Sequence, residues 1–125
     1  ADWPADYVCW EVGLLRHLGF GLDLGSCAVT GATEDLAYVS PKSGRAVTAR
    51  AAAPYRARLL ELPRFLAGGE WDGSSLSISA GLALTGFFLE RHVFDPQGTR
   101  LPASRTRLMD YFSHKPTISS GSMVS

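Results

Sequence analysis

Hydrophobic periodicity changes along this 125-residue chain, and the changes limit the folds that it can adopt. Residues 5–18 carry apolar side chains at a helical period, which predicts an amphipathic helix ended by a glycine-rich stretch. Helical periodicity is absent from residues 26–53, where 36–39 and 45–48 are short runs of β-prone residues. The turn-rich residues 40–44 join these runs, so the sequence predicts a β-hairpin that leans on neighbouring helices.

Helical patterns return in the second half of the chain. Residues 54–66 begin with a proline and continue with apolar residues at helical spacing, which predicts a helix that Pro63 kinks. Residues 74–93 alternate like a strand in part, but their length and their basic last turn favour a helix. Ser104 suits the N-cap of a final helix with Leu108, Met109 and Phe112 as its buried face.

These elements predict a mainly α fold, a helical bundle with an embedded β-hairpin insert at about residues 26–53. The length suits one domain, which we place at residues 1–114, and the serine-rich residues 115–125 are interpreted as a flexible tail. The expected core takes apolar residues from every helix: Tyr7, Leu14, Leu18, Leu59, Leu62, Leu84, Phe87, Phe88, Leu108 and Phe112.

The composition indicates an ordinary globular protein with no membrane segment. Hydrophobic residues make up 46% of the chain, and no uncharged apolar run is long enough to cross a bilayer. The acidic start has neither a signal peptide nor an initiator methionine, so we interpret the chain as part of a longer protein. Two cysteines form no disulfide framework, which favours a reducing, cytoplasmic location.

Charge is balanced in total but uneven along the chain. Residues 1–40 carry a net charge of −5 and residues 41–66 a net charge of +5, while Arg100, Arg105 and Arg107 form a locally unopposed group. Arginine pairs bidentately with phosphate and carboxylate, so these clusters predict a surface for phosphates or for an acidic peptide. Solvated faces without a ligand are the alternative interpretation.

The sequence shows no catalytic motif. Its three histidines lie apart from any obvious nucleophile, and it has no Gly-x-Ser-x-Gly elbow, phosphate-binding loop or His-Glu-x-x-His pattern. A zinc ribbon needs two Cys-x-x-Cys knuckles, but only Cys27 keeps a sulfur, since Thr30, Thr48 and Ala51 occupy the other places. The sequence therefore predicts a non-enzymatic, metal-free protein in which Cys27 is a small buried side chain.

Several short segments form an ordered set that extends over nearly the whole chain. It begins with Tyr-Val-Cys-Trp-Glu-Val-Gly-Leu-Leu at 7–15 and Leu-Gly-Phe-Gly-Leu-Asp-Leu at 18–24. Ala-Tyr-Val-Ser-Pro at 37–41, Phe-Leu-Glu-Arg-His at 88–92 and Arg-Leu-Pro-Ala-Ser-Arg at 100–105 complete the set. Together these segments resemble the C-terminal region of the bacterial recombination mediator family RecO.

The resemblance implies an N-terminal OB-fold, which is not in this chain, followed by a mostly helical domain with a zinc-ribbon-like hairpin. RecO-family proteins bind single- and double-stranded DNA and anneal complementary strands. With RecR and the acidic C-terminal tail of single-stranded-DNA-binding protein, they load the RecA recombinase at the bacterial nucleoid. Some members hold zinc with four cysteines. This chain keeps only Cys27 of the four, so the resemblance implies a degenerate, metal-free zinc ribbon with no cofactor.

On this resemblance we expect a DNA-binding, partner-docking domain that acts in recombinational repair without catalysis. The expected DNA-binding residues are Lys42, Arg45, Arg91, Arg100, Arg105 and Arg107. The expected site for the acidic tail is the 54–66 helix, through Arg56, Arg58, Leu59, Arg64 and Phe65. The alternative is a protein–protein interaction domain with no DNA contact of its own.

Overall fold

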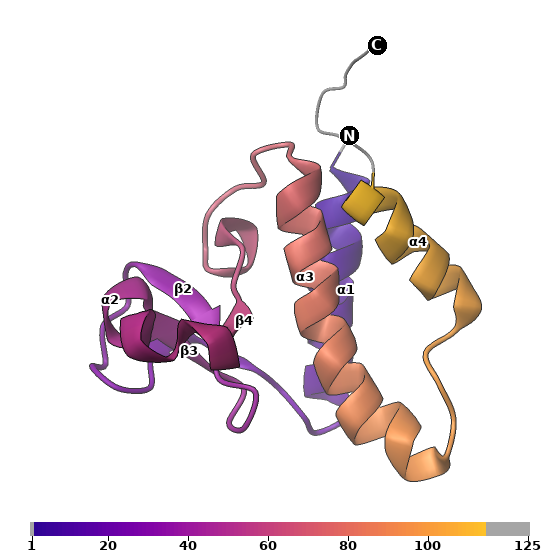
Figure 1. Cartoon of the computed structure of the whole chain (residues 1–125), viewed down its shortest axis with the longest axis horizontal. Coiled ribbons are helices and arrows are strands. Elements are labelled where there is room, and N and C mark those ends of the chain that lie inside the picture. Colours follow the sequence, from indigo (N-terminus) through magenta and orange to yellow (C-terminus); the bar gives the residue numbers. More distant parts are fainter. Residues whose placement is uncertain (1, 115–125) are drawn as a thin grey trace.

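The structure is a computed structural model that describes residues 2–114. Figure 1 shows the longer helices together, with a small sheet and its short helices to one side of them. The mainly α fold with a β element is confirmed. The elements are, in chain order, α1 (Trp3–His17), β1 (Asp23–Cys27), β2 (Leu36–Val39), β3 (Arg45–Thr48), α2 (Ala49–Ala52), η1 (Ala53–Arg58), β4 (Leu60–Glu61), η2 (Arg64–Leu66), α3 (Ser75–Leu89), η3 (Glu90–Phe94), η4 (Asp95–Gln97) and α4 (Ala103–His114).

The sheet contains the predicted hairpin and two further strands that the sequence did not predict. β2 and β3 pair antiparallel across the 40–44 turn, where Gly44 takes a left-handed conformation with φ 71°. β1 lies parallel to β3, and the two-residue β4 pairs antiparallel with β2. The sheet order is therefore β1-β3-β2-β4, with the predicted hairpin in the middle.

α1 is the predicted first helix, and it begins at Trp3 instead of residue 5. Pro4 lies in its first turn, where a missing N–H costs no hydrogen bond. Gly19 follows the helix with φ 92°, a conformation that glycine adopts without steric strain. The buried residues of α1 are Pro4, Ala5, Val8, Glu11 and Leu15.

α3 shows that the ambiguous apolar segment is a helix. The Ser74 hydroxyl caps its start by accepting a hydrogen bond from the Ser77 backbone N–H at 3.2 Å. α1, α4 and β4 all pack on α3, so buried residues lie on several of its sides. Gly81 allows α1 to come close, because a Cβ there would lie 2.9 Å from Val8 Cγ1 and 3.2 Å from Phe65 Cζ.

The helix predicted for residues 54–66 is wrong. The segment forms two short 3₁₀ helices, η1 and η2, with β4 between them. Leu59 and Pro63 both have extended backbone angles, and Leu60–Glu61 pairs with β2. Pro63 accounts for the break, because it lacks the N–H that a continuous helix needs and disfavours the helical conformation of the residue before it.

α4 begins at Ala103, so Ser104 lies inside the helix and the predicted N-cap is two residues too late. Its predicted apolar face is confirmed. Phe112 is buried, and Leu108 and Met109 pack half-buried against the same cluster. The tail predicted for residues 115–125 lies outside the described residues.

Two apolar clusters form the core. The larger joins the sheet to α1 and α3, and the smaller joins α1, α3 and α4. Nine of the ten expected core residues are buried or packed against these clusters. Leu18 is the exception, at 44% exposed, because it lies beyond the last turn of α1. Within residues 2–114, no helix is long and apolar enough to cross a membrane.

Candidate nucleic-acid interface

Lys42, Arg45 and Arg91 come together at the turn of the hairpin, and we call these three residues the hairpin-turn surface. Lys42 is exposed in the turn, and Arg91 of η3 donates a hydrogen bond from Nη1 to the Pro41 carbonyl oxygen at 2.8 Å. Arg45 lies 3.5 Å from the Asp23 carboxylate, which offsets part of its charge. Cations that are far apart in sequence therefore share one exposed surface.

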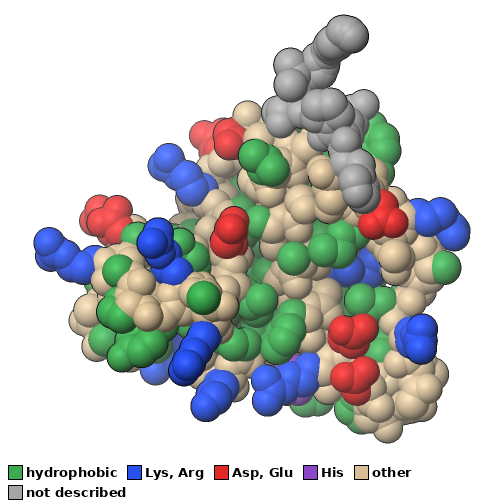
Figure 2. Space-filling view, viewed as in Figure 1, with side chains coloured by type: hydrophobic (Ala, Val, Ile, Leu, Met, Phe, Trp, Pro, Cys, Tyr) green, Lys and Arg blue, Asp and Glu red, His purple; other side chains and the backbone are tan. Residues whose placement is uncertain are grey.

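Basic side chains are also frequent next to this surface. Figure 2 shows Lys and Arg side chains along the lower margin of the molecule, from the short helices beside the sheet towards the helical layer. Arg56 and Arg58 of η1 are both exposed. A chain with no net charge thus presents a locally positive edge.

The structure corrects the expected role of Arg105. This residue is 5% exposed, and its guanidinium donates to both carboxylate oxygens of Glu11, from Nε at 2.7 Å and from Nη2 at 2.8 Å. Glu11 is itself 2% exposed. Arg105 is therefore part of the core and cannot reach DNA, whereas Arg100 and Arg107 are exposed near the start of α4.

Two further groups complete a buried polar network around this ion pair. The Thr85 hydroxyl donates to Glu11 Oε1 at 2.6 Å, and Arg105 Nη2 donates to the Leu82 carbonyl oxygen at 2.8 Å. Gly86 makes room for the guanidinium, because a Cβ there would lie 2.8 Å from Arg105 Nη1. The network ties α1, α3 and α4 together through charge-assisted hydrogen bonds.

The residues expected to bind an acidic tail do not share one helix face. Leu59 packs against the larger core cluster and Phe65 against the smaller one. Arg56 and Arg58 lie on η1. Arg64 lies on η2, where it and Arg50 line a hollow that we call the second hollow. The break at β4 separates the two groups, so the prediction of a single site on one helix is wrong.

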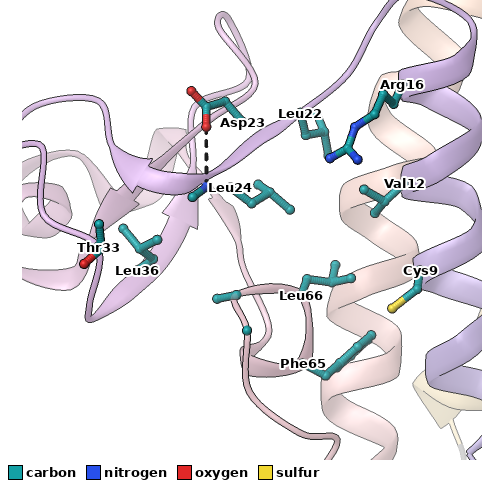
Figure 3. Close-up of a pocket in the computed structure, with 13 residues that line it drawn as sticks. Cys9, Val12, Arg16, Leu22, Asp23, Leu24, Thr33, Leu36, Phe65 and Leu66 are labelled. Carbon is teal, nitrogen blue, oxygen red and sulfur yellow. Dashed lines mark hydrogen bonds between the residues drawn. The ribbon is translucent and has the colours of Figure 1, made fainter.

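Phe65 instead lines an open hollow of about 580 Å³ between α1, β1 and η2. Figure 3 shows Val12, Leu66 and Phe65 along its wall, with the Arg16 side chain extended towards Leu22. The hollow could not be predicted from the sequence, because four separate segments build it. Arg16 was the only basic residue in the first 40 positions, and that was the one available signal.

Cys27 ends β1 with its side chain buried, as expected, at 1% exposed. Its sulfur accepts hydrogen bonds from the backbone N–H groups of Val29, Thr30 and Thr48 at 3.3–3.5 Å. Burial raises the pKa of this thiol, but hydrogen bonds from Thr30, Thr48 and Val29 outweigh burial and lower the pKa to about 6. The amides thus stabilise the thiolate form.

The residues around Cys27 do not fit a zinc ion. Thr30 and Thr48 present hydroxyls and Ala51 a methyl group where a structural site needs thiolate or imidazole. The Thr48 hydroxyl accepts from the Ala51 N–H at 3.2 Å and so caps α2. In the part of the chain that the structure describes, no three His, Cys, Asp or Glu side chains are grouped to hold a metal.

One known protein family matches most of this chain. The family model described as Recombination protein O C terminal matches residues 1–101. The chain belongs to the RecO family. No solved structure matches it.

Curated RecO-family relatives resemble most of this chain. The DNA repair protein RecO of Rhodospirillum centenum is 52% identical over 119 residues, which cover 94% of this chain and 47% of that protein. The Rhodospirillum rubrum protein of the same name is 55% identical over 109 residues, 86% of this chain and 43% of that protein. The Phenylobacterium zucineum protein is 51% identical over 111 residues, 89% and 46% respectively. The chain therefore spans less than half the length of these relatives.

Proposed function

We propose that this RecO-family chain is a non-enzymatic DNA-binding and partner-docking domain of a recombination mediator in DNA repair. The hairpin-turn surface carries the proposal. Lys42 is exposed there, and the hydrogen bond that holds Arg91 goes to a neutral carbonyl oxygen, so it does not cancel the positive charge. Both cations can therefore contact phosphate, on single or double strands.

Strand annealing and recombinase loading need no bond-making group. Two complementary strands repel each other through their phosphates, and dispersed Lys and Arg side chains reduce this repulsion by releasing counterions. Contacts to phosphate leave the base edges available for pairing. In this proposal the domain holds strands while RecR and the tail of single-stranded-DNA-binding protein bring it to the place where RecA is loaded.

Reversing both charges in Lys42→Glu/Arg91→Glu is expected to weaken binding of a single-stranded oligonucleotide at least about tenfold at low salt, because two phosphate contacts become repulsive. Fluorescence anisotropy with this chain measures the affinity. Arg50→Glu/Arg64→Glu is the matched control, since it changes net charge equally at the second hollow. An equal loss in both variants would show that only net charge matters.

The acidic tail of single-stranded-DNA-binding protein is proposed to dock in the hollow of Figure 3. An acidic peptide with apolar residues at its end needs apolar walls with a cation beside them. Val12, Leu66 and Phe65 provide the walls and Arg16 provides the cation. Asp23 also lines the hollow, but its ion pair with Arg45 offsets its negative charge.

Arg16→Glu is expected to weaken binding of a labelled acidic tail peptide about tenfold, because one charge-assisted contact becomes repulsive. Arg56→Glu, which makes the same change on η1, is expected to leave the dissociation constant unchanged. Peptide titration followed by fluorescence anisotropy compares the two variants. A loss in Arg56→Glu alone would place the docking site on η1 and contradict the hollow.

The second candidate function is a protein–protein interaction domain with no DNA contact of its own. The hollow and the zero net charge of the chain favour it. This candidate predicts tail-peptide binding without any shift of single-stranded oligonucleotides. Both assays on the same preparation distinguish the two functions.

We also propose that the hairpin is a degenerate zinc ribbon that folds without metal. The amide hydrogen bonds to the Cys27 sulfur and the Thr48 cap support this proposal, because they connect the two loops where a zinc ribbon has its knuckles. The single thiolate takes its stabilisation from N–H donors in place of an ion.

A further inference from the structure

Three near-parallel rings stack beside the hairpin-turn surface. The Phe88 and His92 ring centroids are 6.1 Å apart with planes at 9°, and those of His92 and Phe20 are 4.7 Å apart with planes at 7°. Phe88 is buried, His92 is half-buried and Phe20 is 40% exposed. The rings therefore lead from the core to solvent and end at Phe20.

The buried end of this stack lies against the turn that carries Lys42, because a Cβ on Gly44 would lie 3.8 Å from Phe88 Cε1. Arg91 precedes His92 in η3, so its bond to the turn holds the turn close to the stack. The Asp23 backbone N–H donates to the Gly44 carbonyl oxygen at 2.9 Å, which holds the segment after Phe20 against the same turn. The segments that carry Phe20 and Arg91 are thus both held to the turn that carries Lys42.

We propose that Phe20 is the stacking platform for one unpaired nucleobase of a single strand whose flanking phosphates contact Arg91 and Lys42. This inference rests on the proposed DNA-binding function and deepens it. Every base has a π-face that can stack on an aromatic ring, so the platform tolerates any sequence. A base inside a duplex has both faces covered by its neighbours, so Phe20 adds affinity for single strands only.

The nearby cations favour a nucleobase over an apolar side chain of a partner as the group that stacks on Phe20. An apolar partner gains nothing from adjacent cations, whereas a nucleotide brings a phosphate to each side of its base. The Arg91 guanidinium has five N–H donors, and the Pro41 carbonyl takes one of its nitrogens, so the others can bind a phosphate oxygen.

The test compares two oligonucleotides of equal length and charge, one of thymidines and one with abasic sugars. Wild-type chain is expected to bind the thymidine strand about 5- to 30-fold more tightly, since stacking adds to the phosphate contacts. Phe20→Leu keeps an apolar side chain but removes the ring, and is expected to bind both strands equally and weakly. Tyr55→Leu, at another exposed aromatic residue, is the control and is expected to keep the wild-type preference.

Each outcome of this test separates the stacking platform from the proposed function. An unchanged preference for thymidine in Phe20→Leu would overturn the platform while leaving phosphate binding intact. Equal binding of both strands by the wild-type chain would overturn it as well. Failure of the wild-type chain to bind either strand would overturn the proposed DNA-binding function together with the platform. Circular dichroism shows whether Phe20→Leu keeps its fold.

Discussion

Replacing Arg105 with methionine is expected to lower the free energy of unfolding by about 3–5 kcal/mol, because the Glu11 carboxylate stays buried without its partner. Domains of this size are stable by only about 5–15 kcal/mol, so Arg105→Met loses a large part of its stability. Urea unfolding followed by circular dichroism measures the difference. Arg107→Met, two positions away on the exposed side of α4, is the control and is expected to change stability by less than about 0.5 kcal/mol.

Two further variants keep the prediction testable if Arg105→Met does not fold. Thr85→Val removes one hydrogen bond to the Glu11 carboxylate, which is expected to cost about 1.5–3 kcal/mol. The double variant Glu11→Leu/Arg105→Met replaces both charges with apolar groups and is expected to recover most of the loss. A Thr85→Val variant as stable as wild type would contradict the buried network.

Replacing Cys27 with alanine is expected to cost about 2–4 kcal/mol at pH 9, because one buried and two partly buried N–H groups lose their acceptor. The folded pKa of Cys27, about 6, is below the ordinary thiol value of 9.0. The thiolate therefore adds stability that is complete above pH 9 and is lost as the pH falls to 6. We expect this part to amount to about 1–2 kcal/mol after screening by solvent near the turn.

Urea unfolding of wild type and Cys27→Ala at pH 6 and pH 9 measures this dependence. The difference between them should be larger at the higher pH. Cys9→Ala is the matched control, because the Cys9 side chain is largely exposed and its pKa is raised, not lowered, by partial desolvation and by Asp6. A difference that does not change with pH would contradict the thiolate, and one equivalent of zinc in purified protein would contradict the metal-free hairpin.

The elements predicted correctly from sequence depend on local patterns. α1, α3 and the hairpin each show their period within one segment. β1 and β4 were missed because their pairing is not local: β1 pairs with a strand some twenty residues later, and β4 is only two residues long. The 54–66 segment had a helical pattern, but Pro63 and the open edge of β2 determined its structure.

The burial of Arg105 could have been predicted from the spacing of residues in α4. Arg105, Leu108 and Phe112 are spaced by three and four residues, so the arginine lies on the apolar face of α4. Glu11 has the same relation to Val8 and Leu15 in α1. Opposite charges on two apolar faces indicate a buried pair. The hairpin-turn surface could not be predicted in this way, because the tertiary fold alone brings Arg91 to the turn.

The salt dependence of single-strand binding tests the central claim most directly. If Lys42 and Arg91 contact phosphates, a plot of log affinity against log salt should have a slope shallower by about 1.4 for Lys42→Ala/Arg91→Ala than for wild type, since each single-strand phosphate contact contributes about 0.7. The same slope in both proteins would contradict direct phosphate contact at the hairpin-turn surface.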